Sequence, residues 1–263
     1  MMNKHEVESK ELRINIAIII CILIIMGIFY AIYRISFVNI SEDAVQPRSS
    51  VMIDYTKESE AATTGAEEFS KTLNVPLVLQ NPELPTGCEA TALTMVLNYY
   101  GYDINKVDLV DGYLQYWDQE YQVGFKGSPF SQDGALMWPP ALVDTANIFL
   151  EQMKSEFHAE DVSGKSFDEL LKYIDDGCPV ILWVNETFTT NINYDGTVDY
   201  YDGHTYYSQW GSHCVVLTGY DEERAVAYIN NPQSDMTEID LYQLWSVYDA
   251  CGKYAVIVIM EEI

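Results

Sequence analysis

The chain has 263 residues, with 14 Lys and Arg against 40 Asp and Glu, and a formal net charge of −26 at pH 7. From Leu73 to the C-terminus there are 7 basic and 30 acidic residues, a net charge of −23. This balance argues against a nucleic-acid partner, because binding to phosphates depends on basic side chains that release counterions. An acidic region would also be repelled by the anionic cytoplasmic face of a membrane, which favours an exported domain.

The first predicted element is a membrane span from Ile14 to Tyr33. These twenty residues carry no charge, and Asn15 is their one strongly polar member. As a helix they would span about 30 Å, the thickness of the hydrocarbon core of a bilayer. The alternative is a cleaved signal peptide, whose apolar region would be shorter, at about 7–15 residues. We predict an uncleaved single-pass anchor at residues 14–33, with residues 1–13 in the cytoplasm and the rest outside the cell.

Residues 34–72 are rich in Ser, Thr, Glu and Asp and poor in large apolar side chains, so we expect a flexible stalk. Residues 73–263 have the texture of a folded domain. In its first half, helices are expected after Thr86, after Pro139-Pro140, and from Ser166 to Asp176. Between the first two lies a long aromatic and glycine-rich segment from Tyr113 to Trp138. A loop of this length in a compact domain is usually functional.

The second half of the domain is predicted to be mainly strands. A hairpin is expected over Asn191 to Asp202, turning at Asp195-Gly196, because Asp-Gly favours a two-residue turn. Tyr254 to Met260 is expected to be a central strand. The other predicted strands are Pro179 to Asn185, Cys214 to Tyr220, and Ala225 to Asn230. Helices followed by mainly antiparallel strands indicate an α+β domain.

Cys88 is expected in the first turn of a helix. Ala90, Leu93, Val96, Leu97 and Tyr100 recur at helical spacing, and Gly101 supplies a C-terminal stop. Thr86 and Glu89 stand at the spacing of a capping box, which would fix the helix start. The unpaired N–H groups and the dipole at a helix start favour a thiolate over a thiol. Cys88 is therefore a candidate nucleophile, although a small buried cysteine would show the same local pattern.

A nucleophilic thiol needs a base, and His213 is the best candidate among the four histidines. It opens a predicted strand, with Gly211 and Ser212 before it leaving room for a neighbour. Alternation along the strand places Cys214 on the opposite face, which makes Cys214 an unlikely rival nucleophile. His204, in a tyrosine-rich polar hairpin, could contact a substrate.

Two amide side chains are candidates for supporting roles. The strand after His213 ends at Asn230-Asn231-Pro232, and a hairpin would return this end to the start of the His213 strand. Asn231 is preferred over Asn230 for orienting the imidazole, although the register stays open. Gln80, eight residues before Cys88, could donate to an oxyanion together with the Cys88 backbone N–H.

The five cysteines give little sign of a disulfide framework. Cys21 lies in the predicted span, and if Cys88 is a nucleophile, an odd number remains, so at least one is free. One bridge among Cys178, Cys214 and Cys251 stays open. No cysteine pair has zinc-ligand spacing, and the sequence implies no metal or cofactor.

Three segments together resemble the C39-like cysteine peptidases, papain-fold relatives of the bacteriocin-processing, double-glycine leader peptidases. They are VPLVLQNPELPTGCEATALTMVLNYYG, GSPFSQDGALMWPPALVDTAN and GSHCVVLTGYDEERAVAYINNPQ, and the resemblance covers about residues 73–260. It implies a papain-like fold with Cys88 as nucleophile, His213 as general base and Gln80 at the oxyanion hole. Asn231 falls where the family commonly has Asp before Pro. Nothing in the sequence resembles the transporter to which the leader peptidases are joined, so double-glycine specificity is not inferred.

We therefore predict a membrane-anchored, extracytoplasmic cysteine peptidase with a Cys88–His213–Asn231 triad and a peptide or protein substrate. Trp138, His204 and Glu89 are predicted to contact the substrate. The alternatives are a catalytically idle peptide-binding module on the cell surface and an acyl or amide transferase that uses the same thioester. The sequence does not predict the oligomeric state.

Overall fold

The structure is a computed structural model that describes residues 70–260 apart from residues 118–120 and 122. The predicted span and nearly all of the predicted stalk lie outside these residues. Within the part that is described, no helix is both long enough and apolar enough to cross a bilayer.

The described residues fold into an α+β domain in which helices precede most of the sheet, as predicted. The helices are α2 (Cys88–Tyr99), α3 (Lys106–Tyr113), α4 (Pro139–Gln152), α5 (Phe167–Asp175) and α6 (Leu241–Ala250). The strands are β1 (Ser70–Thr72), β2 (Phe157–Asp161), β3 (Val180–Asn185), β4 (Tyr194–Tyr201), β5 (His204–Gln209), β6 (Ser212–Asp221), β7 (Val226–Asn230), β8 (Glu238–Asp240) and β9 (Ala255–Met260).

The main sheet is antiparallel and has the strand order β2-β9-β3-β6-β7-β8, with β1 paired to β6. β9 was predicted to be a central strand, and it is paired on both sides, with β2 and with β3. Its apolar run is typical of a strand whose two faces are covered. β3 and β6 lie further into the sheet, and their pairing sets Val184 opposite His213.

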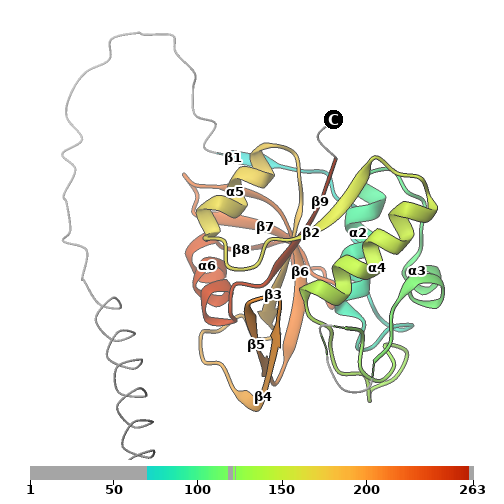
Figure 1. Cartoon of the computed structure of the whole chain (residues 1–263). Coiled ribbons are helices and arrows are strands. Elements are labelled where there is room, and N and C mark those ends of the chain that lie inside the picture. The colour runs from blue at the N-terminus through green and yellow to red at the C-terminus, as the bar shows by residue number, and fades with distance from the viewer. Residues whose placement is uncertain (1–69, 118–120, 122, 261–263) are drawn as a thin grey trace, which may run out of the picture. The chain divides into compact units, whose positions relative to one another are not determined.

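Helices cover both faces of this sheet. Figure 1 shows α2, α3 and α4 grouped on one side and α5 and α6 on the other. Every residue of β3 is buried, because the strand lies between the two layers. On the second face, the rings of Phe167 and Trp245 stack with centroids 6.2 Å apart and join α5 to α6. The predicted capping box of Ser166 and Glu169 at the start of α5 is confirmed.

The hairpin predicted over Asn191 to Asp202, with its turn at Asp195-Gly196, is wrong, because most of that segment forms one strand, β4, and the hairpin joins β4 to β5. β4 and β5 turn at Asp202 and Gly203, whose φ angles of 45° and 81° are both positive, as a type I′ turn requires. Asp195 and Gly196 lie within β4, beside an irregularity in its pairing with β5. The segment contains two Asp-Gly pairs, and local turn propensity cannot choose between them. The second one lets β5 bury Tyr206 and Ser208.

Five elements were not predicted: the helices α3 and α6 and the strands β1, β2 and β8. β1 lies at the end of the predicted flexible stalk and pairs with β6 instead. The two helices carry a recognisable start signal. Asn105 caps α3 by accepting hydrogen bonds from two backbone N–H groups of the first turn. Asp240 caps α6 in the same way, through the N–H of Gln243. An Asn or Asp before an amphipathic segment could have located both helices. The three strands depend on pairing with other strands; β2, for example, pairs with β9, a partner distant in the sequence.

Candidate active site

Cys88 is the first residue of α2, as the sequence predicts. Gly87 is the N-cap, and a Cβ added there would lie 2.8 Å from the Cβ of Leu84, so the tight approach requires glycine. Gly101 follows the last turn with a φ of 92°, which confirms the predicted stop. The apolar positions of the helix are buried under the sheet and hold its N-terminus at the start of β6.

The predicted capping box at this helix is wrong. Thr86 instead donates its hydroxyl to the carbonyl oxygens of Ser128 and Ser131, at 3.3 and 3.0 Å. The Glu89 carboxylate accepts from the backbone N–H of Met137 at 3.1 Å. Both side chains therefore tie the helix start to the segment between α3 and α4. No side chain caps α2, so no capping hydrogen bond occupies the backbone N–H groups of its first turn.

His213 and Asn231 are brought together as predicted. Nε2 of His213 lies 2.8 Å from Oδ1 of Asn231, and both residues are buried. Since Oδ1 can only accept, Nε2 carries the proton and Nδ1 is left as the basic nitrogen. Asn230 points elsewhere, because its side-chain N–H donates to the carbonyl of Val75 at 2.9 Å. The register question left by the sequence is thus resolved in favour of Asn231 as the neighbour of His213.

Cys88 and His213 interact electrostatically, although no hydrogen bond closes on Nδ1 of His213. Hydrogen bonding by Cys214, opposed by burial and aided by His213, lowers the pKa of Cys88 well below its usual value. Burial lowers the pKa of His213, but Cys88, Asn231 and the charge of Glu186 together raise it overall. Opposite shifts of this kind favour a thiolate–imidazolium pair.

The Cys88 sulfur rests against Glu89 and Cys214. Its Sγ lies 3.3 Å from Oε2 of Glu89, and the two sulfurs and a Glu89 oxygen all lie within 4.8 Å of one another. Burial raises the pKa of Glu89 well above the usual value, and the nearby Cys88 adds to the shift, which favours the neutral carboxyl; in the structure the Cys88 thiol donates to Oε2 of Glu89. Cys214, which was predicted on the opposite face of its strand from His213 and as an unlikely rival nucleophile, lies next to the Cys88 sulfur. Burial raises its pKa well above the usual value, so it remains a thiol.

Thiolates and carboxylates are also metal-ligand types, and these three side chains could hold a soft divalent ion. Such an ion would bind the Cys88 sulfur, which could then not act as the nucleophile. The four cysteines within the described residues are all free thiols.

Gln80 is buried beside Cys88. One N–H of its side chain donates to the carbonyl of Pro85 at 2.9 Å, and its Oε1 is buried without a partner. An amide nitrogen carries two hydrogens, so one remains for a second acceptor. The backbone of Gln80 is fixed by hydrogen bonds to the carbonyl of Pro232 and from the Lys106 ammonium, at 2.7 and 2.8 Å.

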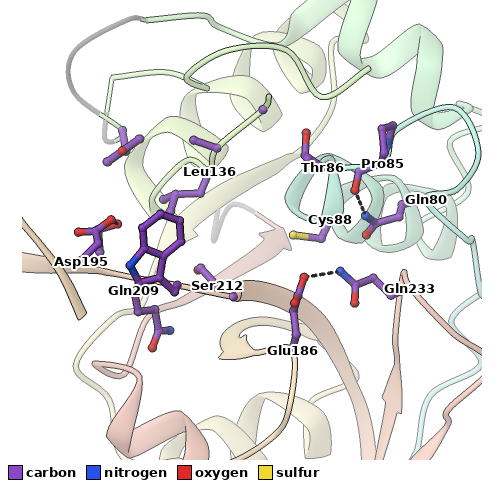
Figure 2. Close-up of a pocket in the computed structure, with 16 residues that line it drawn as sticks. Gln80, Pro85, Thr86, Cys88, Leu136, Glu186, Asp195, Gln209, Ser212 and Gln233 are labelled. Carbon is purple, nitrogen blue, oxygen red and sulfur yellow. Dashed lines mark hydrogen bonds between the residues drawn. The ribbon is translucent and has the colours of Figure 1, made fainter. Parts of the chain in front are cut away.

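Cys88 and Gln80 line a cavity of about 360 Å³ between the helical side of the domain and the sheet side. Figure 2 shows Cys88 and Gln80 on one wall and Glu186, Gln209 and Ser212 on the other. Tyr121 and Gly134 to Leu136 complete the lining, so the long loop predicted to be functional does contribute to it.

The three predicted substrate contacts do not line this cavity. Trp138 is fully buried, where its indole N–H donates to Asp199 at 3.2 Å. Glu89 lies behind Cys88, and His204 begins β5 at the far end of the hairpin. The residues that reasoning from the sequence missed are Glu186, Gln209 and Trp210. Glu186 follows the end of β3, and Gln209 and Trp210 lie at the end of β5, just before the strand of His213. Their position at strand ends beside His213 could have identified them as site residues in the sequence.

Comparison with known proteins agrees with this arrangement. The model of the Peptidase_C39 like family matches residues 72–256. The chain belongs to this family. It is therefore a cysteine peptidase by descent, and the α+β architecture described above is the architecture of C39-like peptidases.

Two relatives illustrate the match. The uncharacterized protein YvpB of Bacillus subtilis (strain 168) is 29% identical over 228 residues, which are 81% of this chain and 86% of YvpB. A solved structure from Bacillus anthracis, described as a C39-like peptidase, is 27% identical with a TM-score of 0.61. It covers 74% of this chain and 99% of its own.

Proposed function

We propose that the chain is a membrane-anchored, extracytoplasmic cysteine peptidase that hydrolyses peptide bonds with Cys88, His213 and Asn231. The observation that carries this proposal is the 2.8 Å contact between Nε2 of His213 and Oδ1 of Asn231. It leaves Nδ1 of a buried imidazole as the basic nitrogen next to a cysteine that lines a cavity. Asn231 holds the tautomer, and His213 supplies the base.

In this mechanism the Cys88 sulfur turns from Glu89 into the cavity as a thiolate, its proton residing on Nδ1 of His213. The thiolate attacks the substrate carbonyl carbon, and the carbonyl oxygen becomes an oxyanion. The Cys88 backbone N–H and the remaining N–H of the Gln80 side chain stabilise that charge. Once Cys88 is deprotonated, a neutral Glu89 carboxyl stabilises the resting thiolate by donating a hydrogen bond to it.

Collapse of the tetrahedral intermediate breaks the C–N bond, and the leaving amine takes the proton from Nδ1. A thioester between Cys88 and the acyl half of the substrate remains. Water then gives one proton to His213 and attacks the thioester, which releases a carboxylic acid and restores the Cys88 thiolate. Transfer to an amine instead of water would use the same residues, so hydrolysis has to be tested by its product.

A first experiment measures the nucleophile in the full chain in detergent micelles. Iodoacetamide at pH 6.5 should alkylate Cys88 at least about tenfold faster than Cys251, a thiol whose pKa is raised by burial, and mass spectrometry measures the modification of each cysteine. His213→Ala should lower the alkylation rate of Cys88 and leave the rates of the other cysteines unchanged. Equal reactivity of Cys88 and Cys251 would exclude the thiolate pair, and with it the peptidase mechanism.

A second experiment identifies the reaction. A library of proteome-derived peptides is incubated with the protein in water enriched in oxygen-18, with glycinamide added as a competing acceptor. Hydrolysis places one heavy oxygen in each new C-terminal carboxylate, whereas transfer yields glycinamide adducts. Cys88→Ala should abolish both products, and Cys178→Ala, a buried thiol that does not line either cavity, serves as the matched control. Adducts without heavy carboxylates would identify a transferase.

The anchor is supported by the uncharged run from Ile14 to Tyr33 and by the acidity of the domain that follows. Its test is protease treatment of intact cells that express the full chain. The domain should be digested from outside while a tag placed before Met1 stays protected. Protection of the domain in intact cells, with digestion only after lysis, would place it in the cytoplasm.

A further inference from the structure

The wall of the cavity opposite Cys88 continues into a second hollow. The second cavity, of about 260 Å³, shares Glu186, Gln209, Trp210 and Gly211 with the first. We call the two together the Glu186 groove. It runs from the candidate nucleophile past Glu186 and along the β3 and β5 ends.

The charged side chains that line the Glu186 groove are acidic. Its described lining residues include the carboxylates of Glu186 and Asp195 and no Lys, Arg or His. Asp195 has a compensating cation nearby, because Lys126, whose ammonium lies over the Tyr121 ring, helps to lower its pKa. Glu186 has no ion-pair partner among the described residues, and its carboxylate accepts only a neutral N–H from Gln233 at 3.1 Å. A negative charge that no Lys or Arg of the described lining pairs with therefore stands beside the reacting sulfur, and the cationic form of His213 is the group that it stabilises.

The carboxylate is held in place rather than left free in solvent. The backbone N–H of Glu186 donates to the carbonyl of Gly211 at 2.9 Å, and Gln233 holds the carboxylate from the other side. A Cβ on Gly211 would lie 3.6 Å from Oε2 of Glu186, and the φ of 68° at this position favours glycine. The backbone conformation therefore favours glycine at position 211, whereas a Cβ there would make only an ordinary van der Waals contact with the carboxylate.

Two further groups in the groove suit a cation. Gln209 is only 5% exposed, yet its Oε1 has no hydrogen-bond partner in the described structure. A buried acceptor without a donor is costly, and a bound N–H would remove that cost. Trp210 is 70% exposed and lines both cavities, so its indole face is available to an alkyl stem or a guanidinium group.

We propose that the Glu186 groove binds a lysine or arginine side chain of the peptide substrate, next to the bond that is cleaved. This inference rests on the proposed peptidase function. The ammonium or guanidinium group pairs with the Glu186 carboxylate and donates to Oε1 of Gln209, while the stem packs on Trp210. Because the domain is strongly acidic, long-range attraction adds to the approach of a basic peptide.

A first experiment tests the charge without requiring hydrolysis. Cys88 in the full chain is modified by two methanethiosulfonate reagents of similar size, one ending in trimethylammonium and the other in sulfonate. The ratio of the two rates cancels the thiolate fraction, so it is independent of any effect of Glu186 on the pKa of His213. We expect the cationic reagent to react about fivefold faster at low ionic strength, with the ratio falling as salt is added.

The matched pair of variants is Glu186→Gln and Glu223→Gln. Both remove one negative charge, but Glu223 is exposed in the turn between β6 and β7, away from the groove. Glu186→Gln should lower the rate ratio at least about threefold, and Glu223→Gln should leave it unchanged. A ratio that Glu186→Gln does not alter, or that both variants lower equally, would overturn the proposal.

A second experiment reads the side chain itself. Proteome peptides made with a glutamate-specific protease, which leaves Lys and Arg inside the peptides, are cleaved by the full chain and their new ends are sequenced. One position within about two residues of the cut should be enriched in Lys and Arg. Glu186→Gln should remove that enrichment, and Glu186→Lys should replace it with Asp, which these peptides retain at internal positions. Cleavage without a preference for Lys or Arg would overturn the proposed subsite, and the proposed peptidase function would be retained. Absence of cleavage would count against the peptidase, while the reagent ratio would still report on the groove.

Discussion

The backbone N–H of Gln80 donates a 2.7 Å hydrogen bond to the carbonyl of Pro232. Gln80 precedes the Cys88 helix, and Pro232 follows Asn231, which contacts His213. The bond therefore joins the segment that carries the proposed oxyanion donor to the segment that orients the proposed base. Two groups whose roles need a fixed separation are held by one short connection rather than by two independent loops.

The neighbouring asparagines should separate activity from stability. Asn231→Ala leaves His213 without its partner, so kcat/KM should fall at least about tenfold. Asn230→Ala removes a buried hydrogen bond to Val75 and should lower the free energy of unfolding by about 1–3 kcal/mol. Its kcat/KM should stay within about threefold of wild type at temperatures where the variant is folded. Equal effects of the two variants on kcat/KM would contradict an orienting role for Asn231.

The alkylation rate of Cys88 should depend on Cys214. Because the pKa of Cys88 is lowered, chiefly by Cys214 and then by His213, the thiolate should persist well below pH ~8.5, where an ordinary thiol titrates. Cys214→Ala and His213→Ala should each move the midpoint of the rate–pH curve upward. Cys178→Ala is the control, since burial raises the pKa of that thiol to about 11 and it lies apart from the site. Midpoints that do not move in either variant would show that Cys88 is not activated by these neighbours.

Glu89 should make the domain less stable as pH rises. Burial raises its pKa in the folded state, so above pH ~4.3 the unfolded chain releases a proton that the folded chain keeps. The free energy of unfolding therefore decreases with pH from about 4.3 until the folded-state pKa is passed. Glu89→Gln keeps an acceptor for the N–H of Met137 but cannot ionise, so its advantage over wild type should grow from pH 5 to pH 8.

Urea unfolding of both proteins at several pH values measures this difference. Ser166 and Glu169 provide the control, because Glu169 is an exposed capping carboxylate whose pKa is lowered instead. Glu169→Gln should lose stability relative to wild type as the pH rises from the lowered folded-state pKa of Glu169 to about 4.3, its pKa in the unfolded chain. This change has the opposite sign to the one expected for Glu89→Gln. A constant difference between Glu89→Gln and wild type from pH 5 to pH 8 would mean that Glu89 does not titrate there.

Gly134 should not tolerate a side chain. An added Cβ would lie 2.0 Å from Oγ1 of Thr86 and 2.5 Å from the carbonyl of Ser128. Gly134→Ala must displace the loop that Thr86 ties to the Cys88 turn, so we expect a loss of about 1–3 kcal/mol in unfolding free energy and a lower kcat. Gly112→Ala, in α3 with open space around it, should be neutral or stabilising by up to about 1 kcal/mol. Thermal unfolding of the two variants gives the comparison.

Much of this fold was predictable because its signals are local. The helical spacing after Cys88, the glycine stop at Gly101 and the capping box at Ser166 each depend on a few neighbouring residues. The misplaced turn at Asp195 shows the limit of such signals, since an identical dipeptide at Asp202 was chosen by the burial of β5.

The amino-acid sequence by itself determined which residues are candidates for the proposed chemistry: a cysteine at a helix start, a histidine opening a strand, and an asparagine just after the end of the next. It could do so because helix periodicity and strand alternation depend on side chains that are close together in the sequence. Only the tertiary structure decided that Glu89 supports Cys88 instead of capping its helix, that Cys214 touches the sulfur, and that Glu186 faces the cavity. Those outcomes depend on long-range contacts, where a side chain takes whichever partner the packed sheet brings within reach.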